Sequence, residues 1–90
     1  MCESKIQTEI LRYLERNECY VVKVVLSNKS GVPDILFCKD GLFYTVEVKA
    51  TGKKKSTTKL QDWNLQKVIE SGGKAIVTDK LSDVIEMIKG

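Results

Sequence analysis

Hydrophobic positions near the N-terminus first follow a helical period and then form a strand-like run. They recur every three or four residues, at Ile6, Ile10, Leu11 and Leu14. This spacing predicts an amphipathic helix over residues 4–17. β-Branched and aromatic residues dominate residues 20–26, which predicts a strand that ends at the polar stretch 27–31.

The middle of the chain has the pattern of a β-hairpin. A second strand is expected to begin at Pro33, the only proline, because proline is tolerated at the first residue of a strand. Residues 39–41 supply a polar connection that contains glycine, and residues 42–50 follow as a third strand.

The next segment predicts a second helix. A polar, lysine-rich loop over residues 51–58 ends at Thr57 or Thr58, either of which can cap a helix that runs to about Ser71. The pair Gly72-Gly73 then ends this helix. Its apolar residues on one face are Leu65, Val68 and Ile69.

A short apolar run over residues 74–78 is typical of a strand. A last helix that reaches the C-terminus is predicted by apolar residues at Leu81, Val84, Ile85 and Ile88. The predicted order is αβββαβα, an α/β fold in which a mixed sheet is flanked by helices, because each amphipathic helix needs a sheet face to cover its apolar stripe. With 90 residues, the chain is expected to form one domain over residues 1–90.

Composition favours a folded chain without a membrane span. Apolar residues make up 42% of the sequence and charged residues 30%, which is within the range of globular domains. The longest apolar runs, such as residues 35–38, are far shorter than the roughly 20 residues of a membrane helix. The polar N-terminus lacks the apolar core of a signal peptide, so we expect an intracellular protein.

Residue usage and charge narrow the chemistry. The chain has no histidine, which removes the usual general base and the commonest transition-metal ligand. Its three cysteines are widely spaced, which argues against a disulfide framework and a zinc site. The net charge of +3 is uneven, because residues 49–59 carry five lysines and no acid. Such a segment is typical of a phosphate-binding patch, although a solvated loop has the same composition.

The predicted strand over residues 42–50 presents an acid and an amine on one face. Side chains alternate along a strand, so its apolar face consists of Leu42, Tyr44, Val46, Val48 and Ala50. Glu47 and Lys49 project together from the other face. A surface ion pair explains this arrangement as well as a catalytic pair does.

Asp34 begins the strand that is expected to pair with this one. The segment Gly31-Val32-Pro33-Asp34 is a plausible turn, but aspartate is depleted in strands, and a partly buried carboxylate needs a cation or a donor. Asp34, Glu47 and a backbone carbonyl between them make a hard oxygen site suited to Mg²⁺ or Mn²⁺.

Two helices offer further polar side chains on their buried faces. On the first helix, Glu3 lies within the apolar stripe and Glu9 on the opposite side, so Glu3 is expected to point inward, although a first-turn acid also complements the helix dipole. On the second, Gln61 falls on the buried stripe, where an amide either bonds to the backbone or serves catalysis. Trp63 is expected to pack at the edge of that stripe, with stacking on a base as the alternative.

These features together resemble the PD-(D/E)xK nuclease superfamily, and more narrowly its virus-type replication-repair nuclease (VRR-NUC) branch. The residues that carry the resemblance are Glu3, the turn Gly31-Val32-Pro33-Asp34, the strand segment Glu47-Val48-Lys49, and Gln61. The resemblance spans nearly the whole chain and implies a restriction-endonuclease-like core. It further implies a small phage- or virus-type protein of the host cytoplasm or nucleoid, which cuts four-way (Holliday) junctions in DNA as a metal-dependent homodimer.

The resemblance also implies a metal site. Asp34, Glu47 and the main-chain carbonyl of Val48 would bind Mg²⁺ or Mn²⁺, with Glu3 helping directly or through water. Glu9 is the substitute if the helix presents its other side.

Catalytic and DNA-binding roles follow from the same resemblance. Lys49 would orient and help activate the attacking water, and Gln61 would position that water or Lys49. The lysines of the loop that follows the strand are placed to hold DNA phosphates, and they are Lys53, Lys54, Lys55 and Lys59.

Two other functions agree with the sequence. One keeps the nuclease chemistry but directs it at flaps, nicks or single strands. The other is a non-catalytic DNA-binding module, in which the lysine loop provides affinity and the acids are structural.

Overall fold

The computed structural model describes residues 1–89 and has the predicted element order, αβββαβα. Its helices and strands are α1 (Glu3–Arg16), β1 (Tyr20–Lys23), β2 (Ile35–Lys39), β3 (Leu42–Val48), α2 (Lys59–Glu70), β4 (Lys74–Thr78) and α3 (Leu81–Lys89). Within the described part of the chain, no helix is long and apolar enough to cross a membrane.

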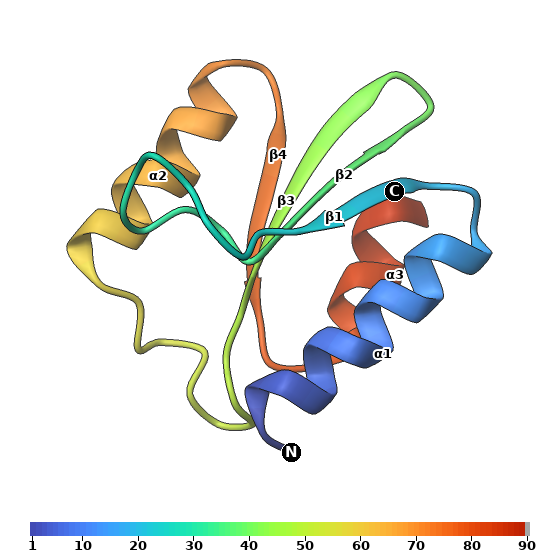
Figure 1. Ribbon diagram of the computed structural model, residues 1–90, viewed down its shortest axis with the longest axis horizontal. Helices are drawn as coiled ribbons and strands as arrows, with labels where there is room; N and C mark the ends of the chain where they lie inside the picture. Colours follow the sequence, from blue (N-terminus) through green and yellow to red (C-terminus); the bar gives the residue numbers. More distant parts are fainter. Residues whose placement is uncertain (90) are drawn as a thin grey trace.

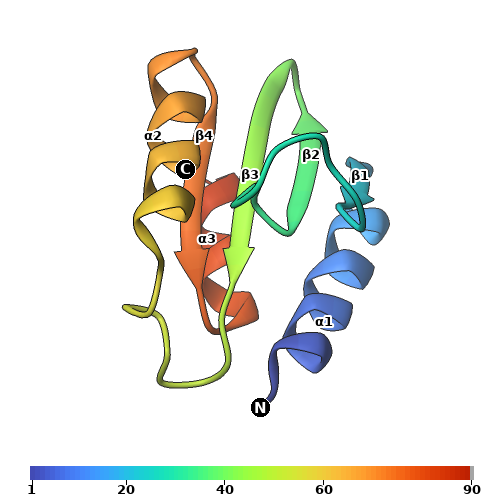
Figure 2. The ribbon, with the colours of Figure 1, turned by 60° about the vertical axis from the view of Figure 1, so that its left-hand side comes forward.

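The four strands form one mixed sheet in the order β1-β2-β3-β4. The first three strands pair antiparallel, whereas β3 and β4 pair parallel, with α2 as the crossover between them. Helices α1 and α3 lie on one side of the sheet and α2 lies on the other (Figures 1 and 2). The α/β fold predicted from the sequence, a mixed sheet flanked by helices, is therefore confirmed.

The hairpin between β2 and β3 sets the register of the functional strand. Lys39 pairs with Leu42, so Asp40 and Gly41 alone form the loop. Both have positive φ angles, of 52° and 80°, as a two-residue type I′ turn requires. The same register places Ile35 opposite Val46, which brings Asp34 beside the end of β3.

The main core lies between the sheet and the pair α1 and α3. Phe37 and Tyr44 stack across the hairpin with ring centroids 4.6 Å apart. The buried apolar residues of this cluster are Ile6, Ile10, Leu14, Ile35, Phe37, Tyr44, Val46, Val48 and Val84. The other side of β3 is also covered, because Thr45 and Glu47 are buried there.

Strand β1 is shorter than the sequence predicts. The predicted strand ran to Leu26, but β1 ends at Lys23, and Val25 and Leu26 are 86% and 93% exposed. Val24 still donates its N–H to the Asp34 carbonyl at 2.8 Å. Val24 and Asp34 form a hydrogen-bonded pair of the antiparallel ladder, so Val25 and Pro33 would be the next, non-hydrogen-bonded pair, and β1 ends before it.

Helix α2 begins with a capping box. Thr58 accepts a hydrogen bond from the Gln61 N–H, and the Gln61 side chain accepts one from the Thr58 N–H. The predicted buried face is correct for Leu65 but wrong for Ile69, which is 49% exposed. The covered side of α2 follows Gln61, Asn64, Leu65 and Val68, and Ile69 lies one position beyond it.

Candidate active site

Asp34 is anchored to the end of β3 by a backbone donor. The Val48 N–H donates to Asp34 Oδ2 at 2.7 Å, and the Asp34 side chain is half-buried. The sequence predicts that a partly buried Asp34 needs a cation or a hydrogen-bond donor, and the Val48 N–H is such a donor. Because the N–H and C=O of a strand residue point the same way, the Val48 carbonyl is directed toward the side of β3 where Asp34 lies.

Glu47 is buried beneath α2, with only 3% of its surface exposed. Within residues 1–89 its Oε1 atom has no hydrogen-bond partner, although buried polar atoms are almost always paired. Burial, reinforced by the negative charge of Asp34, raises the pKa of Glu47 from its ordinary 4.5 to about 8, and Lys49 only partly opposes this rise. A second positive charge beside Glu47 would therefore stabilise its ionised form.

Lys49 and Gln61 complete the group. Lys49 Nζ donates to Gln61 Oε1 at 3.0 Å and lies 3.8 Å from Glu47 Oε2. Gln61 Nε2 donates to that same Glu47 oxygen at 3.4 Å. The Gln61 amide oxygen also accepts the Thr58 N–H, so Gln61 bonds to the backbone as well as to Lys49 and Glu47. Its catalytic role stays a prediction.

Glu3 does not point into the protein as the sequence predicts. It is exposed at the first residue of α1, ahead of Ile6, the first buried residue of this helix. Its charge is still near enough to contribute to the raised pKa of Glu47. Glu9 instead borders a separate surface hollow with Met1, Lys5 and Arg12. Of the two acids, Glu3 is therefore the one whose charge acts on Glu47.

The residues present suit a hard divalent cation. Among residues 1–89, no cluster of three or more His, Cys, Asp and Glu is close enough to hold a metal ion, so a third carboxylate is not in place. Asp34 and Glu47 nevertheless offer carboxylate oxygens beside a backbone carbonyl, and Glu47 Oε1 is buried without a partner. Oxygen ligands of this kind are those that Mg²⁺ and Mn²⁺ prefer.

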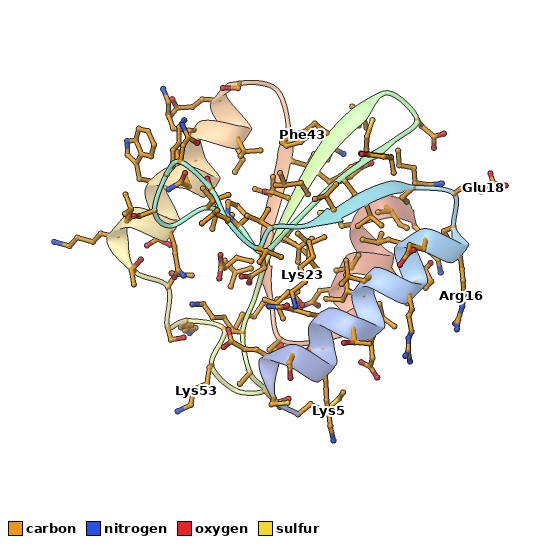
Figure 3. All side chains as sticks on the ribbon, viewed as in Figure 1. Lys5, Arg16, Glu18, Lys23, Phe43 and Lys53 are labelled. Atoms are coloured by element: carbon orange, nitrogen blue, oxygen red, sulfur yellow. The ribbon has the colours of Figure 1, made fainter. Side chains whose placement is uncertain are left out.

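The lysine-rich segment directly follows Lys49 in the chain, and its lysines differ in their contacts. Lys53 points away from the protein (Figure 3), and Lys55 and Lys59 are exposed as well. Lys54 Nζ instead donates to Asp83 Oδ2 at 2.8 Å, at the first turn of α3. The sequence treated the four lysines alike and had no means of finding this long-range pair.

The sequence missed Asn64, which ties the loop before Asp34 to α2. Its Nδ2 donates to the carbonyls of Ser30 and Leu60 at 3.1 and 2.9 Å, and the residue is 8% exposed. Gly31 packs directly beside it, with no space for a Cβ atom next to Leu60. Asn64 shares the buried stripe with Gln61 at a spacing of three, and this was the signal available in the sequence.

Trp63 contributes less to the core than the sequence predicts. It is 52% exposed, and Lys67 Nζ lies 5.8 Å from the centre of its ring. It lines a surface hollow together with Phe43 and Lys67, and Glu47 is not among the residues that line this hollow.

Comparisons with known proteins agree with this arrangement. A family model described as archaeal Holliday junction resolvase (hjc) matches residues 4–89. A solved structure described as a VRR_NUC domain is similar with a TM-score of 0.79 and 24% identity, covering 97% of this chain and 94% of that one. A second, a VRR_NUC domain protein, has a TM-score of 0.80 and 18% identity, covering 99% and 86%. Among curated proteins, none matches significantly.

The structural likeness supports the fold, and the family model spans nearly the full length of the chain. The resemblance to the PD-(D/E)xK superfamily and its VRR-NUC branch is confirmed. The chain belongs to the archaeal Holliday junction resolvase (Hjc) family of PD-(D/E)xK nucleases.

Proposed function

We propose that this nuclease is a Mg²⁺- or Mn²⁺-dependent endonuclease that cuts four-way DNA junctions as a homodimer. The observation that carries the proposal is the buried Glu47 carboxylate, which has one oxygen without a partner and lies beside Asp34 and Lys49. A fold that buries this acid without a full set of donors is best explained by a cation that binds there.

Two carboxylates and one carbonyl would hold the ion, namely Asp34, Glu47 and the Val48 main chain. Glu3, exposed at the start of α1, would contribute directly or through water. When bound, a divalent ion supplies positive charge that stabilises the phosphate and the leaving oxygen during hydrolysis. This chemistry needs no histidine, and the chain has none.

Lys49 would orient the attacking water and help to activate it. Its Nζ is already fixed by Gln61 Oε1 and by the nearby Glu47 carboxylate, so its remaining N–H bonds have a defined direction. Gln61 is the positioning residue, because its amide joins Lys49 and Glu47 to the N-terminus of α2. The loss of either side chain would leave the water without a fixed position.

The branched substrate is proposed from the family to which the chain belongs. A four-way junction is resolved by two matched cuts, and each chain offers one group of this kind, so two copies related by a two-fold axis would supply both. The test is to compare cleavage of four-way-junction, flap, nicked and linear duplex DNA. We expect paired cuts in the junction at a rate at least tenfold above the others. Preferential cutting of flaps or single strands would contradict the junction as substrate, but it would still agree with the proposed nuclease chemistry.

The exposed lysines of the loop should control the salt dependence of DNA binding. Lys53→Ala and Lys55→Ala are each expected to lower the slope of log affinity against log salt by about 0.9, the value for one lost phosphate contact. Lys54→Ala should change the slope less, because its charge is paired with Asp83. Fluorescence anisotropy of labelled junction DNA in EDTA measures the slopes. Equal effects at all three positions would contradict this difference.

A further inference from the structure

The loop between β1 and β2 begins beside the candidate active site. The Val24 N–H donates to the Asp34 carbonyl at 2.8 Å, one step beyond the pair of Lys23 and Ile35. Cα atoms of a hydrogen-bonded antiparallel pair are about 5.5 Å apart, and each further residue adds at most about 3.8 Å. The Cα atom of Leu26 therefore lies within about 13 Å of that of Asp34.

Contacts with α2 fix the far end of this loop. Asn64 Nδ2 donates to the Ser30 carbonyl at 3.1 Å. Gly31 packs so closely on α2 that a Cβ atom there would lie 3.1 Å from Asn64 Nδ2. Inside the loop, the Lys29 N–H donates to Ser27 Oγ at 3.1 Å. Since the loop is held before any ligand arrives, it loses little conformational freedom on binding.

The part of the loop between these fixed ends presents an apolar tip, which consists of Val25 and Leu26. The two side chains are 86% and 93% exposed. Single apolar residues are common on protein surfaces, but two in succession that contribute almost nothing to the core are not explained by folding. The apolar tip therefore suits contact with an apolar surface of another molecule.

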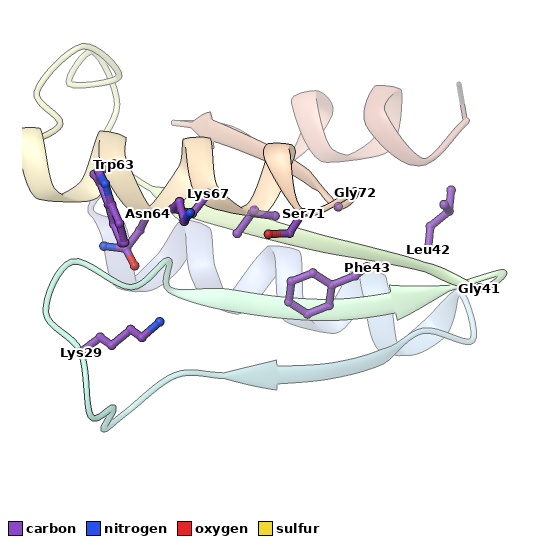
Figure 4. A pocket seen from close by; sticks show the side chains of 11 residues that line it. Lys29, Gly41, Leu42, Phe43, Trp63, Asn64, Lys67, Ser71 and Gly72 are labelled. Atoms are coloured by element: carbon purple, nitrogen blue, oxygen red, sulfur yellow. The ribbon is translucent and has the colours of Figure 1, made fainter.

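The charge around the apolar tip favours nucleic acid. Lys23 and Lys29 flank it and are both exposed, and the sequence has no acid between Glu18 and Asp34. Another cation, Lys67 of α2, lies across a surface hollow from Lys29 (Figure 4). Cations on both sides of an apolar group match the two parts of DNA, since the phosphates lie outside and the flat faces of the bases lie between them.

The distance from the candidate active site also favours DNA over a protein partner. Each base pair adds about 3.4 Å along a duplex, so about 13 Å corresponds to about four base pairs. A phosphodiester bound at Asp34 and Glu47 would therefore bring the neighbouring base pairs within reach of the apolar tip. An acidic protein could match the lysines, but it would have to share this space with the DNA strand.

We propose that Leu26, supported by Val25, packs against a base pair at the branch point of the junction, and this rests on the proposed function. Every base pair inside a linear duplex is stacked on both sides, so an inserted side chain must first unstack two neighbours. Where the arms of a junction part, a terminal base pair can expose one face. Contact with Leu26 costs less there, which makes Leu26 a specificity-determining residue that favours junctions over linear duplex.

The test uses junction DNA that carries 2-aminopurine, a fluorescent adenine analogue that brightens when it unstacks, in a base pair at the branch point. Measured in EDTA, wild-type binding should raise the fluorescence, and Leu26→Ser should remove most of the rise. The same substitution should lower the ratio of junction to linear-duplex affinity about tenfold or more, as expected when a leucine side chain is no longer buried. Leu26→Met keeps an apolar side chain of similar volume and should retain both properties.

Leu42→Ser is the matched control. It makes the same substitution at a residue that is 40% exposed and lies at the opposite end of β3 from Glu47, so it should behave as the wild type. Unchanged fluorescence and junction preference in Leu26→Ser would overturn the proposal, as would equal losses in Leu42→Ser. If Leu26→Ser instead changes the mass of the protein in solution and leaves the fluorescence rise intact, the apolar tip contacts protein and the proposal is wrong.

Cleavage by the same proteins separates this proposal from the nuclease function. If Leu26→Ser cuts DNA with the wild-type preference for junctions, the role of Leu26 is refuted and the nuclease function stands. If the wild type cuts no DNA with any divalent ion, but the fluorescence rise still depends on Leu26, the contact is supported and the nuclease function is refuted.

Discussion

Lys49→Ala is expected to lower the rate of junction cleavage by about a thousandfold while leaving junction binding within a few-fold of the wild type. Removing the amine leaves the attacking water without its donor, and a positioned acid–base group contributes about 10²–10⁴-fold to a rate. The residue is largely buried and lies on the strand end with Glu47, so it offers little surface to DNA phosphates. Single-turnover cleavage and anisotropy binding, on the same protein, measure the two quantities.

Lys89→Ala is the matched control for this experiment, because Lys89 is exposed at the end of α3, on the other side of the sheet from α2. It removes the same charge and should cut at the wild-type rate. Wild-type cleavage by Lys49→Ala would refute the role proposed for Lys49. Parallel losses of binding and cleavage would show that Lys49 acts through DNA affinity instead.

Glu47→Gln is expected to stabilise the metal-free protein at about pH 8 by about 2 kcal/mol, or roughly 10 °C in melting temperature. The folded protein keeps a proton on Glu47 up to about pH 8, because burial and Asp34 raise the pKa of this carboxyl from 4.5. The unfolded chain loses that proton near its ordinary pKa. Between the unfolded-state pKa of 4.5 and the folded-state pKa of about 8, unfolding releases a proton, so the free energy of unfolding falls as pH rises.

The wild type should therefore lose about 3 kcal/mol of stability between about pH 5 and pH 8 in EDTA, and Glu47→Gln should remove most of this slope. Mg²⁺ or Mn²⁺ should restore the stability of the wild type at about pH 8 but should not raise that of Glu47→Gln, because the ion binds the ionised carboxylate. Glu9→Gln, at an exposed position of α1, is the control that should keep the wild-type slope. Thermal melts across the pH range give the result, and equal slopes for the wild type and Glu47→Gln would refute the assignment.

The fold was predictable because its signals are local. The loop Asp40-Gly41 specifies a two-residue turn, and the 3.6-residue spacing of Ile6, Ile10 and Leu14 identifies the face of α1 that is buried. The end of β1 was not predictable from β-propensity alone. It depends on where the neighbouring strand β2 begins, and a local pattern does not show which residues pair across a sheet.

Part of the candidate site followed from alternation along β3. Glu47 and Lys49 lie on one face because they are two residues apart, and Gln61 reaches them because it lies on the covered side of α2. The exposure of Glu3 and the pairing of Lys54 with Asp83 depend on which elements pack together. A helical wheel gives the direction of a side chain but not whether another element lies there to cover it.

Asp34, Glu47 and Lys49 are proposed to form the site of a metal-dependent junction endonuclease, and cleavage of a labelled four-way junction is the direct test of that role. The wild type, Asp34→Asn and Lys49→Ala are each incubated with the junction and with linear duplex, in Mg²⁺, Mn²⁺ or EDTA. We predict junction-selective cutting by the wild type with a divalent ion, none in EDTA, and loss of cutting in both variants. Undiminished cutting in EDTA, or by Asp34→Asn, would contradict this role. Intact junction in every sample would contradict it as well. If the protein still binds the junction that it leaves intact, a non-catalytic DNA-binding module is indicated.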